Sequence, residues 1–133
     1  MSSLAAAEAS AFDLSRSSVP REEILSGGPP KDSIPALTDP QVVSADAATY
    51  LRADDRVLGV AMGHQARAYP IRILNWHEVV NDQLSGTPIV VTYCPLCGTG
   101  MVFRGGRPGH RVLFGVSGLL YNSDVLLYDR ETE

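Results

Sequence analysis

The chain has two cysteines, Cys94 and Cys97, and both lie in the stretch Tyr93-Cys94-Pro95-Leu96-Cys97-Gly98. This stretch follows a β-branched run at 88–92 and leads into the small residues 98–100. Two thiols at this spacing, in a turn that leaves a strand, can share a metal ion, form a redox disulfide or pack without chemistry. The sequence narrows the chemistry to these three options and names no substrate.

The metal hypothesis rests on the pattern Cys-Pro-x-Cys-Gly, which resembles the knuckle of rubredoxin and zinc-ribbon sites. A structural zinc site takes four protein ligands, and the chain has no second cysteine pair. His64, His77, His110 or a carboxylate would have to complete it. Cys94, Cys97 and His77 give three ligands and an open position, which suits catalytic zinc or a copper site. We therefore predict these three residues as metal ligands, with zinc or copper as the ion.

The redox hypothesis uses the same sulfur atoms, with Cys94 as the attacking thiolate and Cys97 as the resolving thiol. In thioredoxin-like proteins the motif precedes a helix, whereas here the glycine-rich residues 98–100 follow it and are poor helix formers. We expect no thioredoxin fold. The third option is a non-catalytic interaction module in which both cysteines tighten a turn. For His77, a structural role beside Trp76 explains its position as well as ligation does.

Other polar groupings have simpler explanations. The stretch 115–118 is similar to a nucleophile elbow, but that pattern needs glycine where Leu119 stands, so a serine hydrolase is not expected. Residues 121–124 are predicted to form a turn whose side chains bond their own backbone. Glu78 and Asp82, four positions apart on a predicted helix, are expected on a solvated face.

Composition places the chain among single-domain globular proteins. It has 133 residues and a net charge of −4, and a negative charge disfavours general binding of nucleic acid. No apolar run approaches the roughly 20 residues that cross a bilayer. The first 12 residues lack the basic and apolar regions of an export signal, so the chain as written is expected to be cytoplasmic.

The element pattern begins with a Pro/Gly-rich segment, and we predict an extended or flexible N-terminal arm over residues 1–40 and a β-rich domain over 41–133. A short helix is predicted from Ser44 to Arg52, and a hairpin over 56–69. A second helix is predicted from Ile71 to Asn81. Its buried face should carry Ile73, Trp76 and Val80.

The second half of the sequence predicts strands. One leads into Cys94, residues 101–104 and 111–114 should pair as a hairpin, and 125–128 should form the last strand. The predicted fold class is α+β, mainly an antiparallel sheet with two short helices and an extended N-terminal arm.

A family resemblance emerges from four segments. Residues 69–82 and 91–100, followed by 114–124 and 128–133, closely resemble the bacterial and archaeal family DUF 3179, a domain of unknown function, and the lead at 22–30 is also similar. The resemblance implies no assigned activity, so whether the chain is an enzyme stays open. The matching positions that look functional are His77, Cys94, Cys97 and the cluster 122–124.

The resemblance also carries expectations about the whole protein. Family members are commonly longer and often have an export signal or lipoprotein lead, which implies a periplasmic or other extracytoplasmic location. The family pattern continues past Glu133 with a further β-rich part, so this chain is expected to be the N-terminal portion of the family domain. Val125–Tyr128 would then be an exposed apolar strand edge through which the chain could associate.

Overall fold

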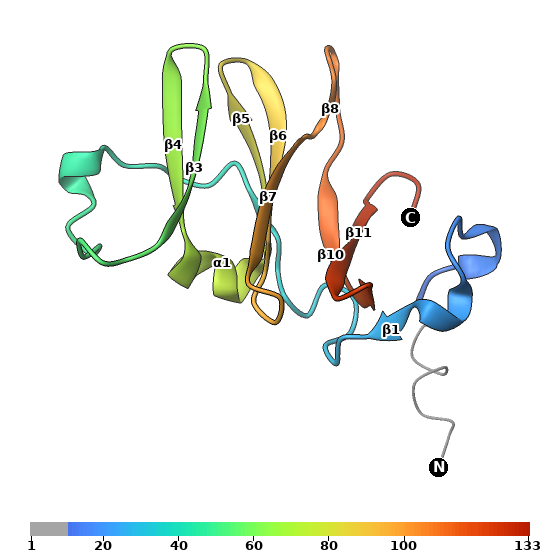
Figure 1. The fold of residues 1–133 in the computed structure, drawn as a ribbon. Coiled ribbons are helices and arrows are strands. Elements are labelled where there is room, and N and C mark those ends of the chain that lie inside the picture. The colour runs from blue at the N-terminus through green and yellow to red at the C-terminus, as the bar shows by residue number, and fades with distance from the viewer. Residues whose placement is uncertain (1–10) are drawn as a thin grey trace.

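Strands make up most of the regular structure in the computed structural model, which describes residues 11–133 (Figure 1). The strands are β1 (Leu25–Ser26), β2 (Leu37–Thr38), β3 (Val57–Met62), β4 (Gln65–Pro70), β5 (Val79–Leu84), β6 (Thr87–Cys94), β7 (Thr99–Arg104), β8 (Gly106–Arg107), β9 (His110–Arg111), β10 (Phe114–Tyr121) and β11 (Asp124–Asp129). The α-helix of the described part is α1 (Ile71–His77), and the 3-10 turns are η2 (Leu14–Arg16), η3 (Arg21–Glu23) and η4 (Ala45–Ala47).

The strands form two main sheets and two separate hairpins. One sheet has the order β2-β5-β6-β7 and the other β1-β10-β11, while β3-β4 and β8-β9 pair only with each other. All pairs are antiparallel except β2 with β5, which is parallel. The α+β, mainly antiparallel class is therefore confirmed. Among residues 11–133, no helix combines the length and apolar composition that a bilayer crossing needs.

Three sequence predictions about elements are confirmed, and three others are wrong in whole or in part. The hairpin over 56–69, the strand into Cys94 and the last strand all form, as β3-β4, β6 and β11. The runs 101–104 and 111–114 do not pair with each other, because β7 pairs with β6 and residue 114 starts β10, which pairs with β11. In place of the helix predicted from Ser44 to Arg52, the chain forms only the 3-10 turn η4. The described residues therefore contain one α-helix rather than two.

The helix α1 is also shorter than predicted. It ends at His77 because Glu78 adopts a positive φ of 59° and Val79 starts β5. β-Branched residues such as Val79 and Val80 favour a strand over a helix. The predicted buried face is wrong for Trp76, which is 77% exposed, and Leu74 is the residue of α1 that packs into the core.

The core lies on both faces of the central strands β5 and β6. One cluster packs under the β3-β4 hairpin and α1, and a second cluster of Val79, Val90 and Val116 joins this sheet to β10. Asn81, fully buried on β5, exchanges two hydrogen bonds with the backbone of Phe114, at 2.8 and 2.9 Å. Its amide thus continues the backbone ladder from one sheet to the other.

The segment 11–40 runs along both sheets. It contributes β1 to the edge of β10 and β2 to the edge of β5, and Ile24, directly before β1, is buried. The backbone also pairs outside the strands, since Gly27 N donates to Gly118 O at 2.7 Å and Asp32 N to Val116 O at 3.0 Å. The arm therefore packs directly against β10, close to the cysteine turn described next.

Candidate functional site at the Cys94–Cys97 turn

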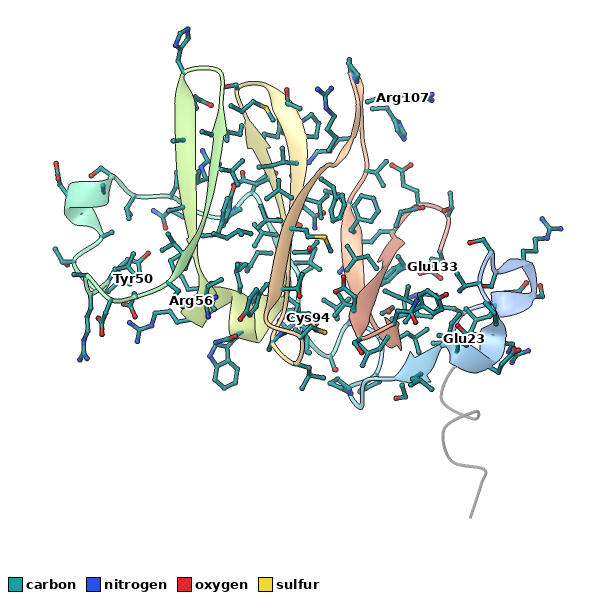
Figure 2. All side chains as sticks on the ribbon, in the orientation of Figure 1. Glu23, Tyr50, Arg56, Cys94, Arg107 and Glu133 are labelled. Atoms are coloured by element: carbon teal, nitrogen blue, oxygen red, sulfur yellow. A yellow bond between two sulfur atoms is a disulfide. The ribbon has the colours of Figure 1, made fainter. Side chains whose placement is uncertain are left out.

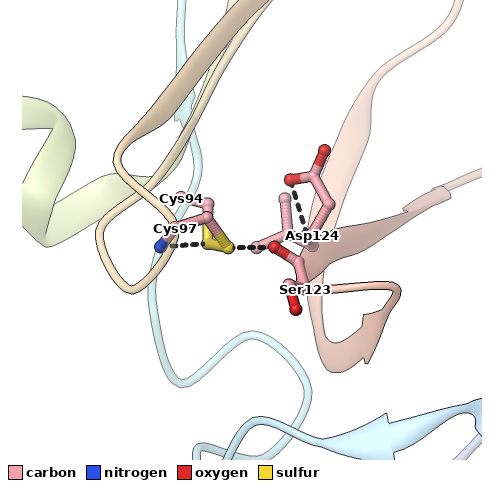
Figure 3. Close-up of a disulfide and its surroundings, with 5 residues drawn as sticks. Cys94, Cys97, Ser123 and Asp124 are labelled. Carbon is pink, nitrogen blue, oxygen red and sulfur yellow. Dashed lines mark hydrogen bonds between the residues drawn. A yellow bond between two sulfur atoms is a disulfide. The ribbon is translucent and has the colours of Figure 1, made fainter.

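The turn between β6 and β7 joins the two cysteines in a disulfide (Figure 3). β6 ends at Cys94 and β7 begins opposite it at Thr99, so residues 95–98 form a tight connection. Gly98 has a φ of +67° and its N–H donates to Cys94 O at 2.8 Å, a conformation that glycine adopts without steric cost. Figure 2 shows Cys94 at the end of the sheet where α1 lies.

The two sulfur atoms have different surroundings. Cys94 is 1% exposed, whereas Cys97 is half-buried at the surface beside the exposed Leu96. The Cys97 N–H donates to Cys94 Sγ at 3.2 Å. A backbone N–H faces Cys94 Sγ and a carbonyl oxygen faces Cys97 Sγ, so the local dipoles favour negative charge on Cys94 rather than on Cys97. The order of exposure is the reverse of that expected for Cys94 as the attacking thiol.

The β10-β11 hairpin approaches Cys97 from the other side. Its turn residues Asn122 and Ser123 both have positive φ, 47° and 61°, which is the type I′ geometry that matches strand twist. This turn places the Ser123 carbonyl oxygen in contact with Cys97 Sγ, on the side away from Cys94 (Figure 3). The prediction of a turn at 121–124 is correct, and the turn is in addition part of the site.

A carboxylate completes a group of three potential metal ligands. Cys94, Cys97 and Asp124 offer two Sγ atoms and a carboxylate oxygen that all lie within 4.8 Å of one another. Asp124 is half-buried at the start of β11 and one of its oxygens accepts the Val125 N–H at 2.8 Å. The sequence prediction counted Asp124 among the functional-looking positions 122–124 of the family resemblance but did not name it as a metal ligand.

The predicted third ligand, His77, lies at the end of α1. Its Nδ1 is 2.7 Å from Pro35 O, so the ring is engaged by the N-terminal arm. His77 is not part of the three-residue group with the cysteines. Ligation by His77 stays a prediction. His64 and His110 are exposed, and His110 lies 3.2 Å from Glu131.

A small cavity opens behind the disulfide. Its volume is about 240 Å³, and its lining comes from the arm, α1, the cysteine turn and the β10-β11 hairpin: Gly27, Pro29, Ile34, Asn75, Glu78, Cys94, Pro95, Leu96, Val116, Gly118, Leu119, Leu120, Val125 and Leu126. Among residues 11–133, Glu78 is the only acidic residue of this lining, and burial raises the pKa of its carboxyl. Glu78 therefore does not lie on a solvated face as expected.

The glycine of the Val-Ser-Gly stretch shapes this cavity. Gly118 has a φ of +78°, and a Cβ there would lie 2.1 Å from Pro29 O. It forms part of a bulge in β10, in which Ser117 Oγ donates to Leu126 O and accepts from Leu119 N. The residues that are similar to a nucleophile elbow thus serve close packing of the arm, with the serine hydroxyl bonded to backbone.

A second polar cluster lies away from the cysteines. Asp82 is buried, in contrast to its predicted solvated position, and accepts from Arg67 Nη1 at 2.6 Å and from Tyr69 Oη at 2.8 Å. Burial and this hydrogen bond raise the pKa of Tyr69 well above its ordinary value. Arg67 and Tyr69 border a wide, mainly aliphatic groove of about 1150 Å³ between the β3-β4 hairpin and residues 40–53. The cluster ties β4 to β5 through the edge of the groove.

Comparison with known proteins gives one result. A family model described as "Protein of unknown function (DUF3179)" matches residues 31–133, which covers most of the chain and every residue of the site except those of the arm before Lys31. No curated protein sequence and no solved structure matches significantly. The expected family is confirmed: this chain belongs to DUF3179.

Proposed function

We propose that the Cys94–Cys97 turn is a thiol–disulfide exchange site. The observation that carries the proposal is a disulfide whose two sulfurs differ in role: Cys94 is buried and has a backbone N–H donor, and Cys97 is half-buried at the surface. Exchange needs an accessible sulfur to be attacked and a partner sulfur that leaves easily as thiolate. Cys97 fits the first requirement and Cys94 the second.

The reaction with a dithiol substrate balances without a further reactant. A substrate thiolate attacks Cys97 Sγ, the bond to Cys94 Sγ breaks, and Cys94 leaves as a thiolate that takes a proton from solvent. The second substrate thiolate then attacks the substrate sulfur of the mixed disulfide and releases Cys97. The substrate is oxidised by two electrons to a disulfide, and the cysteine pair is reduced to two thiols.

The surface around Cys97 favours a protein substrate over a small thiol. Leu96, next to Cys97 in the turn, is 79% exposed and also borders the apolar cavity. An exposed apolar side chain beside a reactive sulfur suits an extended peptide segment that carries cysteines. The presence of a disulfide also favours an oxidising compartment, in line with the extracytoplasmic location implied by the family resemblance.

The first experiment measures whether the disulfide cycles in the folded protein. The oxidised protein is equilibrated with dithiothreitol at graded ratios of reduced to oxidised reagent, the thiols are alkylated, and the mass shift is read. We expect a reversible two-electron transition at constant secondary structure by circular dichroism. A disulfide that is reduced only when the protein unfolds would contradict the proposal and leave a structural turn.

A matched pair of variants tests the roles of the sulfurs. Cys94→Ser leaves Cys97 free, and Cys97→Ser leaves Cys94 free. With glutathione disulfide we expect Cys94→Ser to form a mixed disulfide at least about tenfold faster than Cys97→Ser, because Cys94 is buried. The reverse order would restore the initial hypothesis that Cys94 attacks.

Metal binding is the second candidate function, and it needs the reduced form because a disulfide has no thiolates to offer. The predicted ligand set of Cys94, Cys97 and His77, with zinc or copper, stays a proposal. The observation that favours metal binding is the nearby Asp124.

A further inference from the structure

We propose that reduction of the disulfide creates a divalent-metal site whose protein ligands are Cys94, Cys97 and Asp124, so that metal binding and disulfide formation exclude each other. The inference rests on the proposed function, because the site exists only when the cysteine pair can be reduced. It differs from the sequence prediction in its third ligand, which comes from β11 rather than from α1.

The distances suit one ion. The three ligand atoms lie within 4.8 Å of one another, and two atoms bound to the same zinc ion at about 2.3 Å can be at most about 4.6 Å apart. Once the sulfur–sulfur bond is broken, all three atoms are therefore close enough to bind one ion. Cys94 and Cys97 are held by the turn between β6 and β7, and Asp124 by the β10-β11 hairpin, so the ligands come from both sheets.

The negative charges that arise around the turn after reduction also favour a bound cation. Reduction replaces a neutral disulfide with two thiols beside the Asp124 carboxylate, in a place where Cys94 is buried and both other residues are half-buried. Ionisation of both thiols would put three negative charges within 4.8 Å, which is unfavourable unless a cation binds. The Ser123 carbonyl oxygen, in contact with Cys97 Sγ, adds a further oxygen lone pair on the same side. The groups that would repel a free Cys97 thiolate would thus attract a metal ion.

The donor set indicates the class of ion. Two thiolates with one carboxylate suit a borderline divalent ion such as zinc better than calcium or magnesium, which prefer oxygen alone. Three protein ligands leave a fourth position for water or for a further ligand. Binding of the ion to the dithiol releases two protons.

Oxidation reverses the binding. A small-molecule disulfide accepts two electrons from the two thiolates and two protons from solvent, and becomes two thiols. The Cys94–Cys97 bond forms and the metal ion leaves, since a disulfide sulfur is no longer a thiolate ligand. The turn would therefore release its metal ion when oxidised and take it up when reduced.

Cobalt(II) titration tests the inference directly, because thiolate ligands give cobalt an intense charge-transfer absorption. The protein is reduced and titrated without oxygen, and zinc is then added in competition. We expect stoichiometric thiolate-to-cobalt absorption in the reduced protein, its displacement by zinc, and no binding in the oxidised protein. This comparison of two states of the unmodified chain needs no variant.

The role of the carboxylate is tested with Asp124→Asn. We expect its zinc affinity to fall at least about tenfold, since even residues that only support a ligand can change affinity by that factor. The control Asp54→Asn makes the same charge change at an exposed residue outside the ligand group and should leave the affinity unchanged. Asp124→Glu, which keeps the carboxylate, should retain more affinity than Asp124→Asn.

The outcomes separate this inference from the proposed function. No metal uptake by a reduced protein that still exchanges with dithiothreitol overturns the metal site alone. Equal affinity in Asp124→Asn and Asp54→Asn overturns the assignment of Asp124, and equal binding by the oxidised protein overturns the mutual exclusion. Metal uptake after reduction under denaturing conditions and refolding, with no exchange in the native protein, would overturn the proposed function instead.

Discussion

Two groups of polar or reactive side chains stand out, the Cys94–Cys97 turn and the Tyr69–Asp82 pair. The Tyr69–Asp82 pair is the more buried of the two. Asp82 is 4% exposed and Tyr69 is 5% exposed, so neither is solvated when the hydrogen bond between them is lost. Arg67 supplies the countercharge at 2.6 Å and leaves the carboxylate paired. A tyrosine hydroxyl that donates to a buried carboxylate should therefore contribute measurably to folding stability.

We expect Tyr69→Phe to lower the free energy of unfolding at pH 7 by about 1.5–3 kcal/mol, the range for a hydrogen bond to a charged group. The pKa of Tyr69 is raised on folding by burial first and by Asp82 second. Its contribution is therefore full below the ordinary tyrosine pKa near 10 and is lost as the pH rises toward the folded pKa. Urea unfolding at pH 7 and above pH 10 should show the gap between wild type and variant narrowing, and a constant gap would contradict the role of the hydroxyl.

At the residue level, the sequence predicts the part of the site that is local. Cys94 and Cys97 are identifiable because their spacing and turn residues are contiguous. Asp124 was not identified as a ligand because it meets Cys97 only through the packing of one hairpin against another. Asp82 was misplaced for a related reason: its partners Arg67 and Tyr69 lie on a different strand, and a helix was predicted where β5 begins.

Hairpin β10-β11 is the element that closes the site, and its turn should control the exchange reaction. The Ser123 carbonyl oxygen contacts Cys97 Sγ and so covers part of the surface from which a thiolate can reach this half-buried sulfur (Figure 3). Ser123 holds a positive φ of 61°, which glycine adopts at lower cost than serine.

Ser123→Gly should therefore stabilise the turn by about 1 kcal/mol and keep the carbonyl in place for more of the time. We expect a higher melting temperature and slower reduction by dithiothreitol under native conditions. Faster reduction at equal or higher stability would contradict the view that this turn limits access to Cys97.

The bulge in β10 offers a second test at the level of elements. Gly118→Ala places a Cβ 2.1 Å from Pro29 O at a φ of +78°, whereas Gly86→Ala has a similar φ of +72° and no atom within 4 Å. The control Gly86→Ala should cost about 1–2 kcal/mol for the backbone conformation alone. Gly118→Ala should cost clearly more and displace the arm, measured as urea unfolding and as faster proteolysis in residues 25–40. Equal costs would mean that the arm yields freely at Pro29.

Strand pairs with strong alternation and short turns, such as β3-β4, could be predicted from the sequence because their pairing is local. The end of α1 could not be, because it depends on a positive φ at Glu78, a residue that rarely adopts one. Because the helix was predicted to extend to Asn81, the strand β5, which pairs with β2 and β6, was not predicted. One misplaced helix end therefore changed the predicted burial of Trp76 and Asp82.

Over the whole molecule, the N-terminal arm is fixed by contacts with the C-terminal strand. Asp32 accepts from Tyr128 Oη and from Arg130 Nη2, the latter at 3.0 Å, and Lys31 Nζ lies 2.5 Å from Glu133 Oε1 and 4.6 Å from the Tyr128 ring centre. Figure 2 shows Glu23 and Glu133 on the same side of the molecule. Because these contacts join residues about a hundred positions apart, they form only when the whole domain has folded.

Asp32→Asn removes the charge of this junction and keeps its shape, and asparagine tolerates the positive φ of 57° at this position. Burial and the bond to Asp32 raise the pKa of Tyr128 to about 12, so the variant should lower that pKa, as measured by ultraviolet titration. We also expect faster hydrogen exchange at the amides of Gly27 and Asp32, which pair with β10, and unchanged exchange in β6. An unchanged pKa would remove Asp32 as its cause. Faster exchange throughout the chain would mean that the arm does not open separately but unfolds with the rest of the domain.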